Sequence, residues 1–510
     1  MDREELLERL RGVEWADFEV KAAQRGIPED SYKTVSAFSN SSGGWLVFGV
    51  AERRGSFEIV GVPDPDGMQN SFLGTCRSAD KFSRPIEVRP RLHTFGERPV
   101  LAFYIGPAPR FDKPVQVKVE RRWETFIRVG SGDHRCTRIE EARFLRDASL
   151  ETFDSVTFEG ASVEDLDSPS VDWFRANLGR RSPEQAHPEL DLAGFLSEIG
   201  LLRGGGEVTN AAALMFGKDR LLARLKPGGL VDFRVLHSDF TSESPEQRWD
   251  DRELGERNLV VTLRSLFERL RRLVPQPFEV NARSGERRDD SPDYISVREA
   301  LVNLLVHQDY SDRHRTARIL WFRDATVFEN PGDSFAELPA MLDGGSSQVR
   351  NPILVRLFRQ AGYAEQAGSG IPKIVHTWRA AHRAPPAIVN DPGAKLYRLT
   401  LGWKPLKSQR DEEWYRKLGV EITEDAGRLL TYAREHGAFD LTRARLVTGL
   451  SGSATVSLAS YLVTQQLLAA DEAEGEPAYS LAPHLRELWA ELPAEPRKPA
   501  ATGGVRGGVT

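Results

Sequence analysis

Three glutamates and a lysine near the N-terminus are residue types that can hold a divalent metal ion against a phosphate. Glu14 and Glu19 flank the first predicted strand, and Lys21 lies two residues beyond Glu19, on the same strand face. Glu52 follows the apolar strand WLVFGV. Mg²⁺ and Mn²⁺ prefer oxygen ligands, and a lysine can stabilise the charge that develops on a phosphoryl group. These residue types suit a metal site, but glutamate is common and such spacings arise in any sequence, so the acids alone do not specify one; the alternative is that they are ion-pair partners in a binding domain.

A helix predicted over SVREALVNLLVHQDYS carries a polar face. At about 100° per residue, Glu299, Asn303, His307 and Tyr310 share this face. An asparagine oxygen can bind hydrated Mg²⁺, and a glutamate can polarise an attacking water. Ser296 and Glu299 also fit a helix capping box, which would explain Glu299 but not the polar residues after it. The pattern predicts a site for a Mg²⁺-nucleotide.

Two glycine turns have different interpretations. In AEQAGSGIPKI, Gly368 and Gly370 precede a predicted helix, whose first backbone N–H groups can bind phosphates. In SNSSGG, Gly43 and Gly44 follow a helix, and a helix C-terminus disfavours anions, so these glycines are expected to supply positive φ at a turn. The sequence contains no Gly-x-x-x-x-Gly-Lys-Ser/Thr motif, which excludes a P-loop ATPase.

A basic stretch runs from Lys81 to Arg122. It holds ten lysines and arginines against four acids, whereas the whole chain has a formal net charge of −6. This local excess predicts a surface for a sugar-phosphate backbone, although such residues also protect edge strands from aggregation. The candidate nucleic-acid contacts are Arg84, Arg89, Arg91, Lys113, Lys118, Arg121, Arg122 and, just beyond the stretch, Arg128.

The composition is that of an ordinary soluble protein of several domains. The chain has 510 residues, 40% hydrophobic and 28% charged, and no run approaches the roughly 18 apolar residues of a membrane helix. The N-terminus MDREELLERLRG is acidic, unlike a signal peptide. Cys76 and Cys136 are too few for a disulfide framework or a zinc site. We therefore expect a cytoplasmic protein without membrane contact.

The elements needed to position these residues indicate an α+β multidomain fold. The helix SYKTVSAFSNSS and the strands GGWLVFGVAE, VLAFYIGP, PVQVKVE and WETFIRVG predict a mainly antiparallel first domain. An acidic, serine-rich segment from Glu151 to about Ser170 resembles a linker. The predicted divisions are a first domain at 1–147, a linker and connector helix at 148–189, a second α+β domain at 190–404, a helical module at 415–485 and a disordered tail at 490–510.

The C-terminal module has the order of a winged helix. The segments TEDAGRLLTYAREHG, DLTRARLVTGLS and GSATVSLASYLVTQQLLAADE predict three helices, followed by the ribbon strand EPAYSLA. The third helix contains no lysine or arginine, whereas recognition helices normally bring cations to DNA. Only Arg443 and Arg445, on the second helix, could help. The module is interpreted either as a DNA reader or as a packing module.

The motifs EWADFEVK, KTVSAFSNSSGGWLVFGVAERRG, PVLAFYIGP and FIRVGS, within residues 4–145, resemble the AlbA-like domain of the Schlafen family. This domain also begins many bacterial proteins once called divergent ATPases. In Schlafens that cleave tRNA or rRNA, three acids form a metal-dependent site, and by motif position these match Glu14, Glu19 and Glu52. VAERRG stands where the family usually has an aspartate after GV. Bacterial relatives are more often described only as nucleic-acid binding.

The polar helix, ILWFRDATVFENPGD, VRNPILVRLF and AEQAGSGIPKI, within about residues 190–403, resemble a GHKL-type ATPase domain. The resemblance implies that Glu299 is a general base, Asn303 a Mg²⁺ ligand, and Gly368 and Gly370 phosphate contacts, with His307 beside them. GHKL domains read adenine with an Asp-x-Gly turn, where this sequence has Asn330-Pro331-Gly332. An amide accepts from the adenine amino group less strongly than a carboxylate, so we expect ATP binding more than efficient hydrolysis.

Two functions follow from these resemblances. The first is a Schlafen-like metal-dependent nuclease, with Mg or Mn, that acts on RNA or DNA in stress or antiviral defence and is gated by ATP in the GHKL-like domain. The second is an ATP-responsive DNA-binding transcriptional regulator without nuclease activity. A scaffold with an inactive pocket is a third. Because GHKL domains often dimerise with ATP, the resemblance also implies a homo-oligomer.

Overall fold

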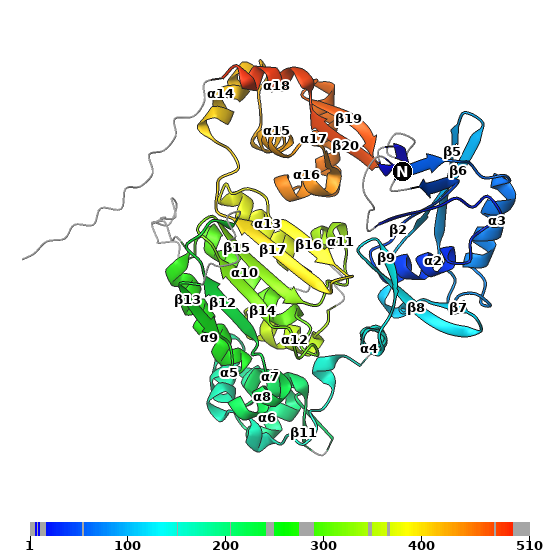
Figure 1. The fold of residues 1–510 in the computed structure, drawn as a ribbon. Helices are drawn as coiled ribbons and strands as arrows, with labels where there is room; N and C mark the ends of the chain where they lie inside the picture. The colour runs from blue at the N-terminus through cyan, green and yellow to red at the C-terminus, as the bar shows by residue number, and fades with distance from the viewer. Residues whose placement is uncertain are drawn as a thin grey trace, which may run out of the picture.

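The apolar side chains gather in cores that follow one another along the sequence, each built from a separate group of helices and strands; Figure 1 shows these groups of elements. The computed structural model describes residues 6–7, 9–10, 17–53, 56–149, 151–204, 206–240, 249–274, 290–344, 349–364, 368–473 and 476–492. Among these residues the largest cores are built from an N-terminal, a middle and a C-terminal set of elements. The chain is a mixed α+β protein of several sheets, which confirms the predicted class; the predicted tail at 490–510 lies almost wholly outside the described residues.

The N-terminal region is built on a four-stranded sheet in the order β1-β2-β6-β5. Strand β2 is buried along its whole length, because Leu46 and Phe48 face one apolar cluster while Trp45 and Val47 face another. β1 runs parallel to β2 and the other pairs are antiparallel. The bounds are β1 (Phe18–Lys21), α2 (Ser31–Asn40), β2 (Gly44–Phe48), β3 (Val50–Arg53), β4 (Ser56–Ile59), α3 (Pro65–Cys76), β5 (Val88–Phe95) and β6 (Arg98–Ile105).

The turn between α2 and β2 requires both of its glycines, for different reasons. Gly43 has a φ of +85°, which side chains rarely adopt. Gly44 instead permits a close approach, since a Cβ there would lie 2.5 Å from the Phe38 ring. The expected turn is confirmed, with positive φ only at Gly43.

A second, three-stranded sheet and a helix complete the N-terminal region. The strands β7 (Gln116–Val119), β8 (Arg122–Val129) and β9 (Gly132–Arg135) pair antiparallel, and α2 packs against β8. Helix α4 (Arg138–Ala148) begins with a capping box between Thr137 and Glu140 and places Phe144 on Ile127 and Cys136. α4 leads the chain from this region toward the middle one (Figure 1).

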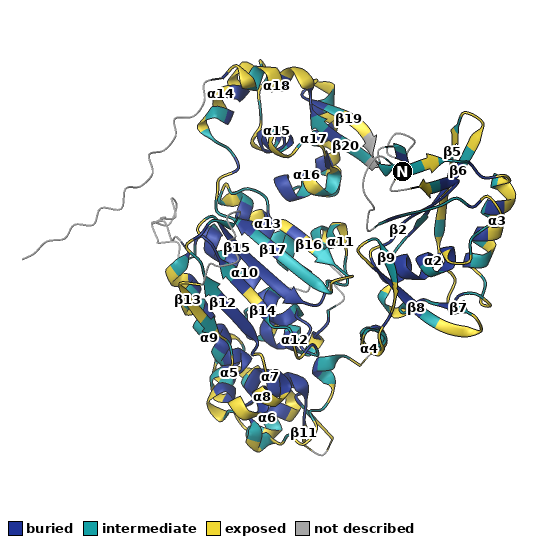
Figure 2. Cartoon of the chain, viewed as in Figure 1, coloured by how far each residue is buried: buried dark blue, intermediate teal, exposed yellow. Residues whose placement is uncertain are grey.

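The middle region has a six-stranded sheet in the order β13-β12-β14-β15-β17-β16, in which only β12 and β14 pair in parallel. Alternate residues such as Ile319 and Phe328 face the largest core, and Figure 2 shows β15 buried along its length, whereas β17 beside it is mostly of intermediate burial. The other face carries ion pairs in which Glu329 binds Arg318 and Arg398. The strands are β12 (Val231–Val235), β13 (Asp251–Leu254), β14 (Ala317–Trp321), β15 (Ala325–Pro331), β16 (Ala387–Asp391) and β17 (Leu396–Gly402).

Helices contribute the rest of this core. The helix predicted around residues 294–310 is α10, and its apolar residues Leu301 and Leu305 are fully buried. The helices of this region are α5 (Ser168–Arg181), α6 (Leu192–Glu198), α7 (Asn210–Phe216), α8 (Asp219–Leu225), α9 (Leu259–Leu273), α10 (Pro292–His307), α11 (Leu338–Asp343), α12 (Pro352–Gln360) and α13 (Gly370–Ala380).

The acidic, serine-rich segment after α4 differs from an exposed linker. Asp154 is fully buried and accepts hydrogen bonds from the backbone N–H groups of Ile353 and Leu354 at the start of α12. Asp167 caps α5, and Leu166 belongs to the largest core. Asp154 and Asp167 therefore act as a buried hydrogen-bond acceptor and a helix cap. Amino-acid composition alone does not distinguish such residues from the solvent-exposed polar residues of a linker.

The C-terminal region contains the three predicted helices in the predicted order, but the third ends at Thr464, and residues 468–472, which were predicted to continue it, belong to a strand. Helix α15 (Glu424–His436), strand β18 (Phe439–Asp440), helices α16 (Leu441–Thr448) and α17 (Gly452–Thr464) and strands β19 (Leu468–Ala473) and β20 (Glu476–Leu481) lie between α14 (Gln409–Lys417) and α18 (Pro483–Ala490). The three strands form a sheet in the order β18-β20-β19. Within the described part of the chain no single helix is long and apolar enough to cross a membrane, and only the pair α16 and α17, bent by 101°, passes that test together.

Candidate nucleotide site and nucleic-acid surface

A pocket opens between α10, the end of β15 and the start of α13. The polar face of α10 contributes three of the predicted residues, β15 and the turn after it contribute two, and the glycine turn that leads into α13 contributes Gly368 and, as the first residue of α13, Gly370. Apolar side chains from β15, β17 and α11 line much of the remainder. The structure therefore brings together all seven residues predicted to bind nucleotide: Glu299, Asn303, His307, Asn330, Gly332, Gly368 and Gly370.

The glycine turn lies directly against the polar face of α10. A Cβ on Gly370 would lie 2.6 Å from Asn303 Nδ2 and 2.8 Å from Oδ1, which leaves no space for a side chain. Gly368 has a φ of +87°. Gly332 has a φ of +94°, and a Cβ there would lie 2.9 Å from Asp309 Cβ. Without side chains at Gly370 and Gly332, the backbone approaches Asn303 and Asp309 closely, while the Gly332 N–H donates to the Lys395 carbonyl.

Glu299 is a pocket residue and not a helix cap. Helix α10 begins at Pro292, and Ser291 is its N-cap, accepting a hydrogen bond from the Tyr294 N–H. Ser296 lies inside the helix, where its hydroxyl donates to the Pro292 carbonyl. The capping-box alternative is therefore wrong. Glu299 is 3% exposed, and its Oε2 lies 3.4 Å from Lys373 Nζ of α13.

The polar face ends at His307. Burial, and secondarily the charge of Arg350, lower the pKa of His307 to about 4, so the imidazole is neutral at physiological pH. Tyr310 was predicted on the same face, but it follows the helix and is 1% exposed in the core, where its hydroxyl donates to the Leu305 carbonyl. The polar stripe therefore stops one turn earlier than the spacing predicts.

Polar atoms in the pocket lack protein partners. Among the described residues, Asn303 Nδ2, Asn330 Oδ1 and the Tyr397 hydroxyl are buried without a hydrogen bond. Buried polar groups are normally satisfied, and an unsatisfied group costs about 1–3 kcal/mol. The pocket thus offers an amide oxygen and a carboxylate suited to Mg²⁺, backbone N–H groups suited to phosphates, and an unpaired acceptor beside apolar walls suited to a base. These residues fit a Mg²⁺-nucleotide.

The acids of the N-terminal region are placed differently. Glu14 lies outside the described residues. Glu19 pairs with Lys21, at 2.8 Å from Oε1 to Nζ, and with Arg128, at 3.0 Å from Oε2 to Nη2. Glu52 is exposed on β3, which forms a hairpin with β4. The described residues contain no group of three or more His, Cys, Asp or Glu side chains that could hold a metal. The three-acid metal site stays a prediction.

Arg128 differs from the other candidate nucleic-acid contacts. Its side chain is 4% exposed, and its guanidinium binds Glu19, Asp133 and the Phe18 carbonyl while lying 5.2 Å from the centre of the Phe38 ring. The prediction of Arg128 as a surface contact is therefore corrected: β8 places it between α2 and β1, where it holds these elements together. Lys113 is half-buried and donates to the Asn40 carbonyl, and burial lowers its pKa to about 8.

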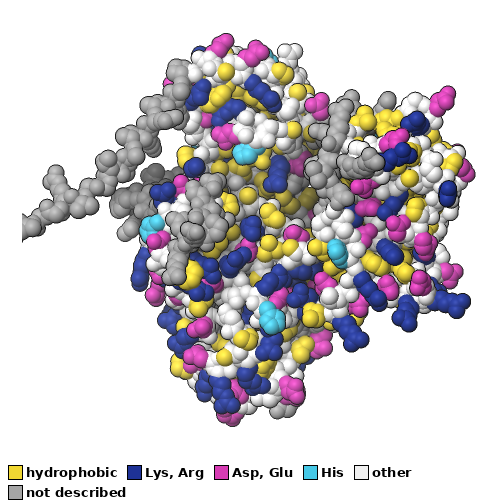
Figure 3. Space-filling view, viewed as in Figure 1, with side chains coloured by type: hydrophobic (Ala, Val, Ile, Leu, Met, Phe, Trp, Pro, Cys, Tyr) yellow, Lys and Arg dark blue, Asp and Glu magenta, His cyan; other side chains and the backbone are white. Residues whose placement is uncertain are grey.

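The remaining cations of the predicted surface are exposed, except for Lys118, which is half-buried. Arg84 and Arg89 have acidic partners, Asp112 and Glu87. Within the described part of the chain, four have no ion-pair partner: Arg91 on β5, and Lys118, Arg121 and Arg122 on the β7–β8 hairpin. Figure 3 shows basic and acidic side chains interspersed over the visible face rather than separated. The unpaired cations concentrate on the β7–β8 hairpin, beside the exposed Trp123.

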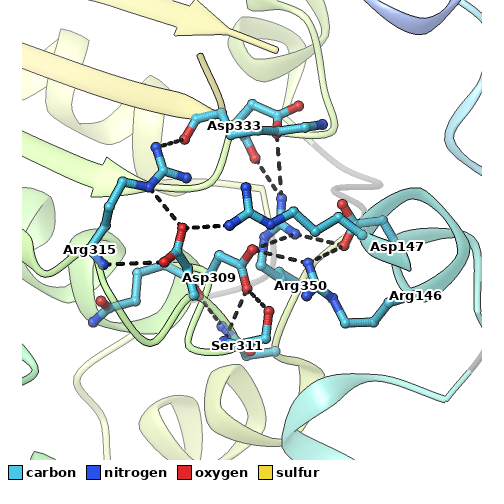
Figure 4. Close-up of polar contacts among 12 residues, drawn as sticks. Arg146, Asp147, Asp309, Ser311, Arg315, Asp333 and Arg350 are labelled. Atoms are coloured by element: carbon cyan, nitrogen blue, oxygen red, sulfur yellow. Dashed lines mark hydrogen bonds and ion pairs between the residues drawn. The ribbon is translucent and has the colours of Figure 1, made fainter. Parts of the chain in front are cut away.

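A buried ion-pair network at the pocket was not predicted from the sequence (Figure 4). Arg350 lines the pocket, is 8% exposed and donates to Asp147 of α4 at 3.0 Å. Arg146 of α4 donates to Asp309 at 3.1 Å. Burial would raise the pKa of Asp309, but Arg350 and Arg146 lower it to about 2. These residues lie in separate parts of the sequence, and no local spacing signals their contact.

Three family models match parts of the chain. "Schlafen, AlbA_2" matches residues 14–137, "Putative ATP-dependent DNA helicase recG C-terminal" matches residues 314–397, and a domain of unknown function, DUF8451, matches residues 142–232. The match at 314–397 contains Asn330 and Gly332 and begins after α10, so the roles of Glu299 and Asn303 rest on the pocket itself. No curated protein matches the chain.

Solved structures give weak structural likeness. The DIP2311 protein from Corynebacterium diphtheriae is 18% identical, with 94% of each chain covered and a TM-score of 0.42. The N-terminal domain of a putative ATP-dependent DNA helicase RecG-related protein from Nitrosomonas europaea is 28% identical over 26% of this chain and 92% of that one, with a TM-score of 0.22. By the family models, residues 14–137 are similar to the Schlafen AlbA_2 family, and residues 314–397 are similar to the recG C-terminal family.

Proposed function

We propose that this protein binds a Mg²⁺-nucleotide and acts on nucleic acid under the control of that nucleotide. The observation that carries the proposal is the contact between Gly370 and Asn303, which places the first turn of α13 against the polar face of α10 in a pocket with unsatisfied polar atoms. The names of the two matched families, Schlafen AlbA_2 and recG C-terminal, support a nucleic-acid-related, ATP-binding protein.

Different walls of the pocket would bind different parts of MgATP. Asn303 and Glu299 would hold Mg²⁺, and the turn from Gly368 to Gly370 would bind the phosphates at the start of α13. Asn330 would accept a hydrogen bond from the adenine amino group, and Phe328 and Leu399 supply apolar walls. When bound, Mg²⁺ would neutralise phosphate charge. Glu299 Oε2 also lies 3.4 Å from Lys373 Nζ, so a cation already faces this carboxylate.

Nucleic acid would bind to the N-terminal region. The unpaired cations of the β7–β8 hairpin, Lys118, Arg121 and Arg122, present positive charge to phosphates, and binding of this kind weakens as salt concentration rises. Lys113, Arg84, Arg89 and Arg91 are additional contacts of lower expected weight, because burial or a carboxylate competes for the first three.

The placement of the acids favours binding without cleavage, the regulator form of this function. Glu19 is engaged by two cations, and Glu52 is exposed on a hairpin. One observation favours a nuclease as a second form: Lys21 lies 2.8 Å from Glu19 on the predicted strand face, within the residues that the Schlafen AlbA_2 model matches. A role in antiviral or stress defence is proposed only for the nuclease form.

The C-terminal module contacts the helices that border the pocket. Arg445 of α16 donates to Asp343 of α11 at 2.6 Å, and Arg379 of α13 donates to Asp425 of α15 at 2.6 Å. With no cation on α17, packing against the pocket helices is better supported than DNA reading by that helix. The module would sense nucleotide occupancy through α11 and α13. A nucleotide-dependent homo-oligomer is part of the same proposal, and light scattering with and without MgATP tests it.

One experiment separates the two forms. Wild-type protein and Glu19→Ala are incubated with Mn²⁺ and labelled tRNA, single-stranded RNA and DNA, while calorimetry measures MgATP binding. The regulator form predicts MgATP binding and retained nucleic-acid binding without cleavage by either protein. Metal-dependent cleavage that is lost in Glu19→Ala establishes the nuclease form. Absence of both MgATP and nucleic-acid binding by the wild type would overturn the proposed function.

A further inference from the structure

Arg350 has one nitrogen without a partner, and that nitrogen lies at the end of the pocket assigned to the base. Its side chain is 8% exposed and lines the pocket, and Nε is buried without a hydrogen bond among the described residues. A Cβ on Gly332 would lie 3.3 Å from this Nε. Gly332 ends the Asn330-Pro331-Gly332 turn, where Asn330 Oδ1 is likewise unpaired. An unused donor and an unused acceptor therefore line the same end of the pocket.

The other nitrogens of Arg350 are already committed. Nη1 donates to Asp147 Oδ1 at 3.0 Å, and Nη2 donates to the Asp333 carbonyl at 3.0 Å. The guanidinium also lies 4.2 Å from the centre of the Phe335 ring, as does the guanidinium of Arg110 from the N-terminal region. A guanidinium is planar and its donors have a fixed geometry, so these contacts determine the direction of the Nε–H group.

Asp147 belongs to α4, at the junction with the N-terminal region. Arg146, next to it, binds both Asp147 and Asp309 at 3.1 Å, and Arg110 donates to the Asp147 carbonyl. Figure 4 shows Arg350 between Asp147 on α4 and Asp333 at the pocket. The junction of the N-terminal region is therefore bonded to a side chain that also forms the pocket wall.

We propose that Arg350 is a nucleotide-binding residue whose Nε–H donates to an acceptor on the base, and that Asp147 positions it, so that nucleotide binding and docking of α4 strengthen each other. The donor of Arg350 and the acceptor of Asn330 match adenine, which carries an amino donor beside ring-nitrogen acceptors. Docking of α4 fixes the guanidinium before the ligand arrives, which reduces the ordering that binding requires. By linkage, the nucleotide then stabilises the docked junction to the same extent. This inference rests on the proposed nucleotide site.

Calorimetry with MgATP tests the assignment. Arg350→Lys keeps a positive charge for Asp147 but removes the Nε donor, and we expect an affinity about tenfold lower or weaker still, as for loss of a charge-assisted hydrogen bond. Arg359→Lys, exposed on α12, is the matched control and is expected to bind as wild type. Asp147→Asn, which leaves the pocket lining unchanged, is expected to weaken MgATP about threefold to tenfold through the loss of positioning. Asp172→Asn, exposed on α5, is its control.

Hydrogen–deuterium exchange tests the coupling directly, because a purely structural role of Asp147 would not make amide exchange in α4 respond to MgATP. MgATP should slow amide exchange in α4 of the wild type and leave it unchanged in Asp147→Asn. If wild-type protein binds MgATP while Arg350→Lys and Asp147→Asn bind within twofold of it, the inference is overturned and the nucleotide site stands. If the wild type does not bind MgATP, the proposed function itself is overturned. If Arg350→Lys does not fold, Asp147→Asn still tests the coupling between nucleotide binding and α4, through both its MgATP affinity and its amide exchange in α4.

Discussion

Gly370 and Asn303 occupy adjoining space at the centre of the pocket: a Cβ on Gly370 would lie 2.6 Å from the Asn303 amide nitrogen and 2.8 Å from its oxygen. Real Cβ atoms essentially never approach another heavy atom this closely. With any side chain at this position, either the Asn303 amide or the start of α13 would have to move. This one contact joins the residue predicted to bind Mg²⁺ to the turn predicted to bind phosphates, and it makes both testable.

Removal of the Asn303 amide should abolish MgATP binding. Asn303→Ala deletes the only neutral oxygen that the polar face of α10 offers to a hydrated cation within the described pocket. Its Nδ2 has no hydrogen bond to lose, so the free energy of unfolding should change by less than about 1 kcal/mol. Calorimetry measures the affinity, with Asn70→Ala, exposed on α3, as the control. Unchanged affinity in Asn303→Ala would refute the placement of the site.

Adding a single methyl group at residue 370 should weaken MgATP binding by displacing Asn303. In Gly370→Ala the new Cβ displaces the Asn303 amide or the start of α13, and we expect MgATP affinity to fall about tenfold or more. Gly74→Ala is the matched control, because a Cβ there meets nothing within 4 Å in helix α3, where alanine is the better helix former. Equal nucleotide affinities for the two variants would show that the close contact has no role in binding.

The pocket that we propose for the nucleotide could be predicted from the sequence because its signals are local. The helical spacing of Glu299, Asn303 and His307 and the glycines before α13 are properties of short segments, and both lie where expected. The capping-box alternative failed because Ser291 and Ser296 both precede the helix's apolar run, and only the structure shows which begins it.

What the sequence could not show is contact between distant segments. Arg350 meets Asp147 across 203 positions, and nothing in the residue types around either one signals that pair. The sequence likewise names both Arg128 and Arg122 as candidate nucleic-acid contacts, although α2 and β1 bury the first and leave the second exposed. The segment after α4 has a linker's composition, yet Asp154 is buried because α12 supplies it with backbone donors.

His307 should make the stability of the protein depend on pH below neutrality. Its pKa is lowered from 6.5 to about 4 by burial and by Arg350, so between these values the unfolded chain binds a proton that the folded protein excludes. The free energy of unfolding should therefore fall as pH falls from 6.5 toward 4, by roughly 1–3 kcal/mol from this residue.

Urea denaturation at pH 7 and pH 4.5 checks this, with His307→Gln as the comparison. The variant should lose less stability than the wild type over this interval. Asp309 stays ionised throughout it, because its pKa is about 2, and Lys113 and Lys226, with pKa values of about 8, stay charged. Equal losses in the wild type and the variant would assign the pH dependence to other groups.

Substitution of Arg122 should weaken nucleic-acid binding, whereas substitution of Arg128 should destabilise the fold. Arg122→Ala removes an exposed cation of the β7–β8 hairpin, so nucleic-acid affinity should fall and the slope of log K against log salt should decrease by about 1, with stability unchanged. Arg128→Ala leaves Glu19 and Asp133 without their shared partner, so the free energy of unfolding should fall by about 3 kcal/mol. Fluorescence anisotropy with labelled RNA and DNA over a salt series, together with urea denaturation, measures both. If Arg128→Ala were as stable as the wild type and altered only the salt slope, Arg128 would be a phosphate contact after all, and the surface assigned to the hairpin would have to extend to β1 and Glu19.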